Sequence, residues 1–397
     1  LQDASSFISY IVAKENRIEA HQEPLIRKKA LLFPLATAMN FFSFTGLLIV
    51  AGLLVSRELT ANIAIGQAAI VAIFFSLSGN ARNILLASNS EEDEKNILYF
   101  RLMVLLPAIV VVYWAAKMAI DIPTLLIIGL ISRKCSEWFA ELQLANKEKK
   151  NDFTFAARYI LLNTVAFLAL LSTLVVPSWI GYFYSALYTW AIVPIVFLPC
   201  YIWRLLNIKQ SKVSYAHLMP HLGSSAIIGI TIYIFRVLIV FLVGKFLAGQ
   251  LFTAYALGGV ISSIYTYAIG PSVMLHNKGR KKTILGYSVL FCALLGVLVL
   301  FSHLLFDIKA YSPMFIKAVG LSLIGGGVMI WAQHQRLYIL QVCKKNVFVP
   351  DALANVLLIL SIPFVYYLYG EASLPFLYLW SAILNFLFFI SLARKAS

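Results

Sequence analysis

The most constraining feature of this 397-residue chain is a series of apolar runs, each about as long as a bilayer is thick. A helix needs roughly 20 apolar residues to cross the hydrocarbon core, whereas a membrane β-strand needs about 9–11 residues of alternating polarity. The runs are much longer than such strands and do not alternate. With 61% hydrophobic and 12% charged residues, a soluble protein could not hide this apolar surface. The sequence therefore predicts an all-α polytopic membrane protein.

Windows of about 20 residues, the length that a bilayer requires, place about twelve transmembrane helices along the chain. We number them as spans 1 to 12. Their approximate bounds are 30–55, 61–80, 97–117, 123–145, 152–176, 179–203, 222–246, 250–275, 283–305, 313–336, 350–369 and 372–393.

The basic residues predict how these spans are oriented. Of the 32 Lys and Arg residues, 26 lie at a terminus or at an even-numbered connection, such as the one between spans 2 and 3. Because cytoplasmic loops are enriched in Lys and Arg, this predicts that both termini are cytoplasmic. The polar span 4 must be counted as a membrane span, since without it every later basic cluster would lie on the opposite side of the membrane. The net charge of +15 thus reflects membrane topology, and no zinc spacing or nucleic-acid fold indicates a nucleic-acid partner.

The longest inner connection predicts the domain organisation. It covers residues 206–221 and separates six spans from six, so we expect a cytoplasmic linker between bundles at 29–205 and 222–397. Two six-helix bundles around a central cleft are the architecture of alternating-access carriers. Residues 1–28 form a mixed cytoplasmic segment. We interpret it as a tether, with an interfacial helix or a remnant of upstream sequence as the alternatives.

Arg236 lies near the middle of the apolar run 222–247. A charge at that depth costs about 2.5–3.5 kcal/mol on insertion scales, so a lipid-facing position is disfavoured. We predict that Arg236 contacts an anionic substrate. The alternative is a structural arginine bonded to backbone carbonyls or a hydroxyl.

Span 4 carries a second polar set. Arg133, Glu137 and Glu141 are four residues apart and share one helix face, and Lys134 is three residues before Glu137. One interpretation is a cleft wall in which Arg133 and Lys134 bind substrate while Glu137 and Glu141 couple to an ion. The other is a self-neutralising patch of ion pairs. Arg158, on span 5, could share this cavity or extend to the membrane surface.

Gly325, Gly326 and Gly327 interrupt span 10 and are hinge candidates, although glycine in membrane helices also eases packing. The chain shows no nucleophile–base constellation, nucleotide fingerprint or histidine pair for a metal, so we expect no enzyme activity and no cofactor. The four cysteines are widely spaced and read as small buried hydrophobes. Transport would then depend on an ion gradient or the membrane potential.

Two regions carry a resemblance to a known family. The first contains the segment 79–83, the acidic loop 91–94 and Arg101 at the start of span 3. The second runs from Gln335 and Arg336 through the basic pair 344–345 to the segment 351–355. With twelve spans, these resemble the polysaccharide exporters and Wzx-type O-antigen flippases of the multidrug/oligosaccharidyl-lipid/polysaccharide (MOP) exporter superfamily. The resemblance is diffuse along the chain. The long polar N-terminus is unusual for that family.

The resemblance implies a flippase that moves an undecaprenyl-pyrophosphate-linked oligosaccharide to the periplasmic leaflet of the bacterial inner membrane, for O-antigen, capsule or exopolysaccharide synthesis. Its pyrophosphate would meet a cationic cavity formed by Arg236, Arg133 and Lys134. Membrane lipids, a polysaccharide polymerase and a chain-length regulator are the further partners it suggests. The drug-exporting branch uses acids in span 1 or 7, and neither span contains Asp or Glu here.

Two other functions stay open. An ion-coupled transporter of a small molecule, a sugar or a drug, also has twelve spans. A membrane O-antigen polymerase or ligase would need a large outer loop, and the outer connections here are short, such as 177–178 and 370–372.

Overall fold

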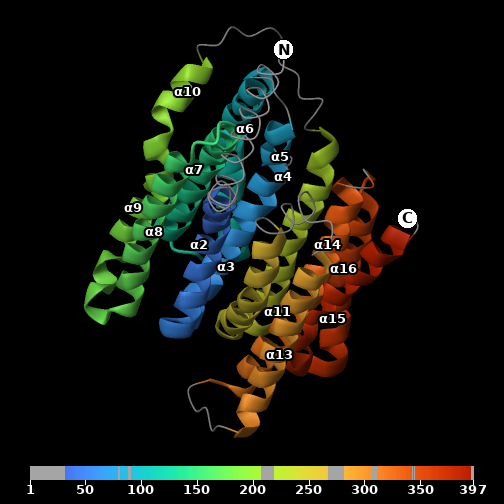
Figure 1. Cartoon of the computed structure of the whole chain (residues 1–397). Coiled ribbons are helices and arrows are strands. Elements are labelled where there is room, and N and C mark those ends of the chain that lie inside the picture. The colour runs from blue at the N-terminus through green and yellow to red at the C-terminus, as the bar shows by residue number, and fades with distance from the viewer. Residues whose placement is uncertain are drawn as a thin grey trace, which may run out of the picture.

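The structure is a computed structural model that describes residues 32–78, 81–87, 91–206, 219–266, 281–305, 311–341, 343 and 345–394. The predicted N-terminal segment 1–28 and most of the linker 206–221 lie outside these residues. The described part of the chain is helical and contains no strand. In Figure 1, the helices of spans 1 to 6, blue to green, lie on one side, and those of spans 7 to 12, yellow to red, on the other.

Every predicted span overlaps a helix. Spans 1 to 6 correspond to α2 (Leu32–Leu54), α3 with η1 and α4 (Arg57–Ile70, Val71–Phe75, Ser76–Ser78), α6 (Glu91–Ala119), α7 (Thr124–Lys149), α8 (Phe153–Val175), and η2, α9, η3 and α10 (Pro177–Tyr182, Phe183–Ile192, Val193–Phe197, Pro199–Leu206). Spans 7 to 12 correspond to α11 (Met219–Ile264), which holds two of them, α13 (Lys281–Leu305), α14 (Pro313–Gln341), α15 (Phe348–Tyr369), and η5 with α16 (Gly370–Phe376, Leu377–Arg394). The short α5 (Ala81–Ala87) between spans 2 and 3 was not predicted.

The helices have the length and composition that a bilayer requires. In the described residues, eight helical stretches are long and apolar enough to cross a membrane, and α2, which bends by 47°, is a ninth candidate. Two of the eight, Leu222–Ile264 and Phe348–Arg394, each contain two predicted spans. The polar α7 falls outside this group because of its charged residues, which include Arg133 and Glu137. A multi-pass all-α membrane fold is therefore confirmed.

Helix α11 is a hairpin rather than one long rod. A straight helix separates residues 20 positions apart by about 30 Å, yet the rings of Phe235 and Tyr255 lie 5.8 Å apart. The chain turns back at Gly244, whose φ of 75° and ψ of 169° are readily adopted by glycine alone. The turn comes before the predicted connection 247–249, because the apolar pattern continues past the glycine and does not mark it.

The connections alternate between two ends of the molecule. At one end, Lys245 donates to the backbone oxygen of Asp121 at 3.0 Å, and the Tyr311 hydroxyl lies 3.5 Å from the backbone oxygen of Leu53. These contacts join connections 7–8 with 3–4 and 9–10 with 1–2, so we call this the odd end. At the opposite, even end, Arg82 pairs with Glu148 at 2.7 Å. The alternation that the basic residues predict is therefore present, and the cytoplasmic location of the even end stays a prediction.

The buried apolar residues are divided differently at the two ends. The largest cluster joins both halves of the chain, with Phe44 and Leu126 from the first half and Ile239 and Phe315 from the second. Toward the even end, a separate cluster around Tyr159 lies within spans 1 to 6, and two more lie within spans 7 to 12. The described halves therefore share one core toward the odd end and have separate cores toward the even end.

The three glycines of α14 allow three helices to approach its axis. A Cβ at Gly325 would lie 3.0 Å from the Cα of Leu379 in α16, and one at Gly326 would lie 2.6 Å from the backbone oxygen of Gly258 in α11. A Cβ at Gly327 would lie 3.1 Å from the Cβ of Cys292 in α13. Since α14 runs unbroken from Pro313 to Gln341, close packing is the role seen here, and the hinge stays a prediction.

Gly258→Ala is expected to destabilise the protein. The new Cβ would lie 2.1 Å from the backbone oxygen of Ser322, so α11 and α14 must separate, and overpacking of this kind costs about 1–3 kcal/mol. The thermal unfolding temperature in detergent should fall. Gly286→Ala is the matched control, since nothing lies within 4 Å of its Cβ position. Equal shifts for the two variants would contradict the packing argument.

Candidate functional site

Arg236 lies where the two halves of the chain meet. From the first arm of α11, its Nη1 donates to the backbone oxygen of Ala64 at 2.5 Å and to Oε1 of Gln67 at 3.1 Å, both on α3. Its guanidinium lies 5.8 Å from the ring centroid of Phe252, on the second arm of α11. All these partners are neutral. The side chain therefore joins spans 2, 7 and 8 without losing its charge to a carboxylate.

Small residues bring the two helices close enough for this contact. A Cβ at Gly229 would lie 3.0 Å from the Cα of Ala72, so α11 and η1 approach backbone to backbone. About two turns from this approach, on α3, Ala64 is fully buried and leaves its carbonyl within reach of the guanidinium. Close approach through glycine and alanine is the usual way in which membrane helices associate. The sequence pattern located the mid-span arginine, and the packing supplies its neutral acceptors.

Arg133 has a different environment. It is fully buried, and its Nε donates to Oε1 of Glu137 at 2.7 Å. Its Nη1 donates to Oδ1 of Asn163 at 2.9 Å and to the backbone oxygen of Trp190 at 2.7 Å, and the guanidinium lies 4.5 Å from the Trp190 ring. Helices α7, α8 and α9 thus enclose it within the first half. Lys134 is partly exposed and lies 3.8 Å from Oε2 of Glu137.

The second carboxylate of span 4 binds an arginine that we had not proposed as a site residue. Arg101 on α6 is fully buried, and its Nη2 donates to Oε2 of Glu141 at 2.9 Å. Its Nη1 also donates to the backbone oxygen of Trp138, and its guanidinium lies 4.8 Å from the Trp138 ring. The sequence did contain a signal for this pair. Span 3 begins with Arg101, and the next span carries an acid, Glu141, without a basic residue assigned to it. Each candidate coupling residue, Glu137 and Glu141, is therefore held by an arginine.

Arg158 is exposed on α8 and does not contribute to the Arg133 cluster. The alternative, in which this side chain extends to the membrane surface, stays a prediction. As substrate contacts, Arg133, Lys134 and Arg158 stay predictions. Arg133 and Lys134 lie in an ion-pair network with Glu137, and Arg158 is an exposed cation.

A third ion pair, with a buried carboxylate, lies at the even end of the second half. Asp351, 1% exposed, accepts from Nε of Arg336 at 3.2 Å and from its Nη2 at 3.0 Å. The Ser224 hydroxyl at the start of α11 donates to the same carboxylate. Arg336 and Asp351 are the two ends of the second region that carried the family resemblance, so this contact gives that motif a physical role. It ties α14, α15 and α11 together.

The described interior thus contains two kinds of arginine. Arg101, Arg133 and Arg336 each contact a carboxylate. The contacts described for Arg236 are all neutral. In a medium of low dielectric constant, an arginine without a carboxylate partner attracts anions strongly. Among the described residues, no group of three His, Cys, Asp or Glu side chains could hold a metal ion.

Comparison with known proteins identifies the fold. No protein-family profile matches the sequence, and no curated protein matches it significantly. Solved structures do match. A crystal structure of a MATE variant has a TM-score of 0.56 at 13% identity, covering 94% of this chain and 97% of that one. A MATE in complex with MaL6 has a TM-score of 0.53 at 14% identity, covering 93% and 96%.

A third similar structure is described as the inward-facing conformation of a multidrug resistance MATE family transporter of the MOP superfamily. Its TM-score is 0.51 at 12% identity, and the match covers 92% of this chain and 97% of that one. At these identities the likeness concerns the fold alone. It extends over nearly the whole length of both chains. The chain therefore has the fold of the MATE transporters of the MOP superfamily.

Proposed function

We propose that this protein is a flippase that moves a lipid-linked oligosaccharide, with an undecaprenyl-pyrophosphate carrier, from the cytoplasmic to the periplasmic leaflet of a bacterial inner membrane. The glycan would serve O-antigen, capsule or exopolysaccharide synthesis. The fold of the MATE transporters supports a transport function of this general type. The termini and the even end would face the cytoplasm, following the distribution of basic residues.

The observation that carries the proposal is the neutral environment of Arg236. The guanidinium lies at the contact between the two halves, bonded to an amide and a carbonyl oxygen. A diphosphate offers acceptors with negative charge, and charge-assisted hydrogen bonds are roughly twice as strong as neutral ones. An anion entering between the halves would therefore compete well for this side chain.

The division of the core supports entry from the even end. The halves share apolar packing toward the odd end and have separate cores toward the even end. If the even end is cytoplasmic, this arrangement suits uptake of a substrate made in the cytoplasm. Short connections at the odd end, such as residues 55–56 and 120–123, leave little room for the outer domain of a polymerase.

Export of cationic drugs is the second candidate, because a similar structure is described as a multidrug resistance transporter. The charges favour the flippase. Arg236 would repel a cation, and the buried acids Glu137 and Asp351 are each paired with an arginine. The third buried acid of the described residues, Glu94, accepts hydrogen bonds from Asn146 and Tyr201 within the first half. A drug exporter would need a carboxylate that can bind the cation where the halves meet, and none of the contacts described for Arg236 is to a carboxylate.

Deletion of the gene tests the proposal directly. We expect lipid-linked oligosaccharide to accumulate on the cytoplasmic face, because synthesis continues while translocation stops. Accessibility of the glycan to a lectin in inside-out and right-side-out vesicles measures this. Sensitivity of the same strain to cationic dyes is the parallel measurement. Intermediates that cross normally, together with increased dye sensitivity, would favour drug export instead.

A further inference from the structure

Gln67 is the second side chain at the Arg236 contact, and its position is unusual for an amide. It lies on α3, in a helical stretch of 22 residues that runs from Arg57 to Ser78. At 1.5 Å per residue, Gln67 is about 15 Å along a stretch of about 33 Å, close to the middle of the span. The residues around it, 63–66 and 68–70, are Ile, Ala or Gly. An amide in such a setting is costly unless it has a hydrogen-bond partner.

The packing of α3 on α11 carries Gln67 to the junction of the two halves. Toward the odd end, a Cβ at Gly249 of α11 would overlap the backbone oxygen of Arg57. Toward the even end, a Cβ at Gly229 of α11 would lie 3.0 Å from the Cα of Ala72. We call the contact between these two glycines the seam. Gln67 lies between them, so its side chain is enclosed by both halves and bonds across the seam to Arg236.

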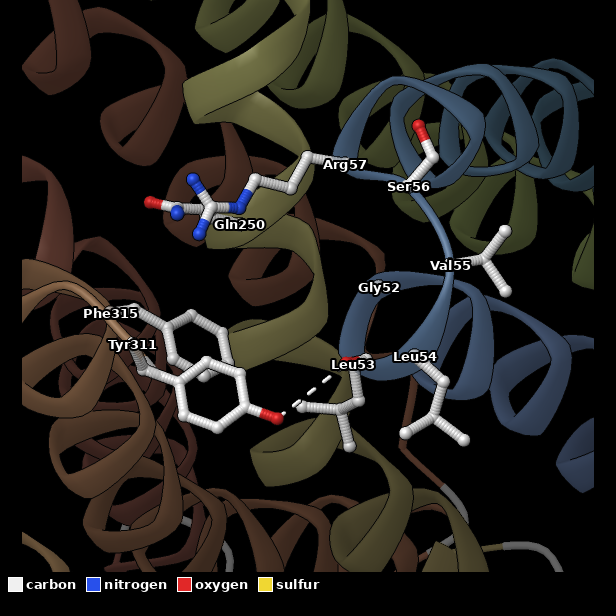
Figure 2. Close-up of a pocket in the computed structure, with 9 residues that line it drawn as sticks. All are labelled: Gly52, Leu53, Leu54, Val55, Ser56, Arg57, Gln250, Tyr311 and Phe315. Atoms are coloured by element: carbon white, nitrogen blue, oxygen red, sulfur yellow. Dashed lines mark hydrogen bonds between the residues drawn. The ribbon is translucent and has the colours of Figure 1, made fainter. Parts of the chain in front are cut away.

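A pocket of about 180 Å³ lies at the odd end of the seam. Figure 2 shows it, with Arg57 at the start of α3 extending toward Gln250 on α11. Sites for drug-sized ligands are roughly 300–1,000 Å³, so this pocket is too small for a lipid headgroup that carries a glycan. Neither Gln67 nor Arg236 lines it. The mid-span contact between these two side chains is therefore a separate feature of the seam.

The guanidinium of Arg236 is held by one of its three nitrogens. Its Nη1 donates to the backbone oxygen of Ala64 and to Oε1 of Gln67, and two acceptors suffice for the two hydrogens of that nitrogen. Among the described residues, Nε and Nη2 have no hydrogen-bond partner, and they are not among the buried polar atoms that lack one. The edge formed by Nε and Nη2 is therefore accessible. A phosphoryl group binds to such an edge through two parallel N–H groups.

Gln67 also decides the charge at this point of the seam. Arg101, Arg133 and Arg336 each contact a carboxylate, so their charges are compensated. A glutamate at position 67 would do the same for Arg236, whereas glutamine supplies an acceptor without a negative charge. The two side chains are nearly equal in size and differ by an NH₂ in place of an O⁻. The guanidinium thus keeps its full charge where charges are weakly screened.

We propose that Gln67 is a positioning and selectivity residue for the transported anion. It holds Nη1 of Arg236 so that the Nε–Nη2 edge faces a phosphoryl group, and its neutrality keeps the contact selective for anions. This inference rests on the proposed function in so far as the phosphoryl group belongs to the diphosphate of a lipid-linked glycan. The headgroup of an anionic phospholipid has the same chemistry and is the other source.

Binding of farnesyl diphosphate to the full-length protein in phosphatidylcholine nanodiscs tests this. Gln67→Glu should weaken binding about a hundredfold, since a carboxylate at hydrogen-bond distance compensates the guanidinium and repels the probe. Gln67→Leu removes a neutral acceptor and leaves the charge, so a loss of roughly threefold to tenfold is expected. The unfolding temperature of Gln67→Glu should stay close to that of the unsubstituted protein, because a carboxylate oxygen still accepts from Arg236.

The order of the two variants separates selectivity from structural support. If Gln67 only holds α3 against α11, Gln67→Glu keeps the hydrogen bond and binds the probe normally, whereas Gln67→Leu is the impaired variant. Gln333→Glu is the matched control, because it adds the same charge to another partly exposed glutamine, on α14, whose amide nitrogen lies 3.8 Å from the sulfur of Met329. Its binding should match that of the unsubstituted protein.

Two results overturn the inference. One is binding by Gln67→Glu as tight as that of the unsubstituted protein, and the other is weaker binding by Gln67→Leu than by Gln67→Glu. A fluorescent phosphatidylglycerol is a separate arm that identifies the source of the phosphoryl group. Binding that depends on Gln67 for this lipid alone identifies a phospholipid headgroup as the ligand, and for the prenyl diphosphate alone it identifies the carrier lipid.

The proposed function can fail independently of this inference. Normal glycan export by Gln67→Glu, in spite of lost binding, would contradict the flippase and leave the anion contact intact. Loss of export in Arg236→Ala, together with normal binding by Gln67→Glu, would overturn the role of Gln67 and leave the flippase intact.

Discussion

Arg236→Ala is expected to abolish export of the lipid-linked glycan while the protein accumulates at close to its normal level. The substitution removes a charge that costs about 2.5–3.5 kcal/mol to place at this depth, and its partners are neutral groups that lose little without it. A hydrogen bond to a charged group contributes about 1.5–3 kcal/mol, which corresponds to a tenfold to hundredfold loss of substrate affinity. Surface glycan and membrane abundance of the protein, measured in one strain, check both parts.

Arg236→Lys is the informative control. Lysine keeps the charge but lacks the planar fork, so partial export is expected. Lys150→Ala changes an exposed cation of the first half that is not a proposed substrate contact, and it should leave export almost unaffected. If Arg236→Ala reduces abundance as much as it reduces export, the arginine is a structural cross-link between α11 and α3, and the anion site must be sought elsewhere.

Arg133→Met is expected to have the opposite signature, with loss of the folded protein rather than of transport by a folded one. The substitution leaves Glu137, 3% exposed, without its 2.7 Å partner inside the first half. Breaking a buried ion pair by removing one member costs about 3–5 kcal/mol, because the remaining charge is uncompensated. Membrane abundance and thermal unfolding in detergent should both fall markedly.

The double variant Arg133→Met/Glu137→Leu tests the cause. Replacing both members of a buried pair by apolar residues of similar volume is often close to neutral, so most of the lost stability should return. If export returns with it, Arg133 and Glu137 are structural. A stable double variant without export would restore Arg133 as a substrate contact or Glu137 as a coupling residue.

The positions of the membrane-spanning helices could be predicted from the sequence because they depend on local properties. Each apolar run is long enough to span a bilayer by itself, and basic residues cluster at the ends of spans whatever the tertiary packing. Span 4 is a good example. Its charges obscured the hydropathy signal, yet the position of later basic clusters required it, and α7 is a helix over Thr124–Lys149. The turn of α11 lies at Gly244, before the predicted connection 247–249, because a positive φ leaves no mark on hydropathy.

The polar sites were predicted less well, since a side chain's role depends on which helices pack against it. The common helix face of Arg133, Glu137 and Glu141 was visible in the spacing. That Arg133 bonds to Glu137, Asn163 and Trp190, whereas Glu141 bonds to Arg101, was not. Arg57 looked like a single basic residue on the less basic side. Only the packing of α11 and α14 against the α2–α3 turn reveals that it lines a pocket.

The sequence by itself determined that this chain crosses the membrane many times, that the connections between spans lie alternately at the two ends of the molecule, and that a cation lies deep in span 7. Transfer from water to lipid is a property of each segment, so these conclusions need no knowledge of neighbours. Only the tertiary structure decided which of the arginines within the helices are paired with a carboxylate. Arg236 meets Ala64, 172 residues away in the chain, and no carboxylate, whereas Arg101, Arg133 and Arg336 each meet one. Coulomb energy depends on the distance between partners, and that distance is set by helix packing.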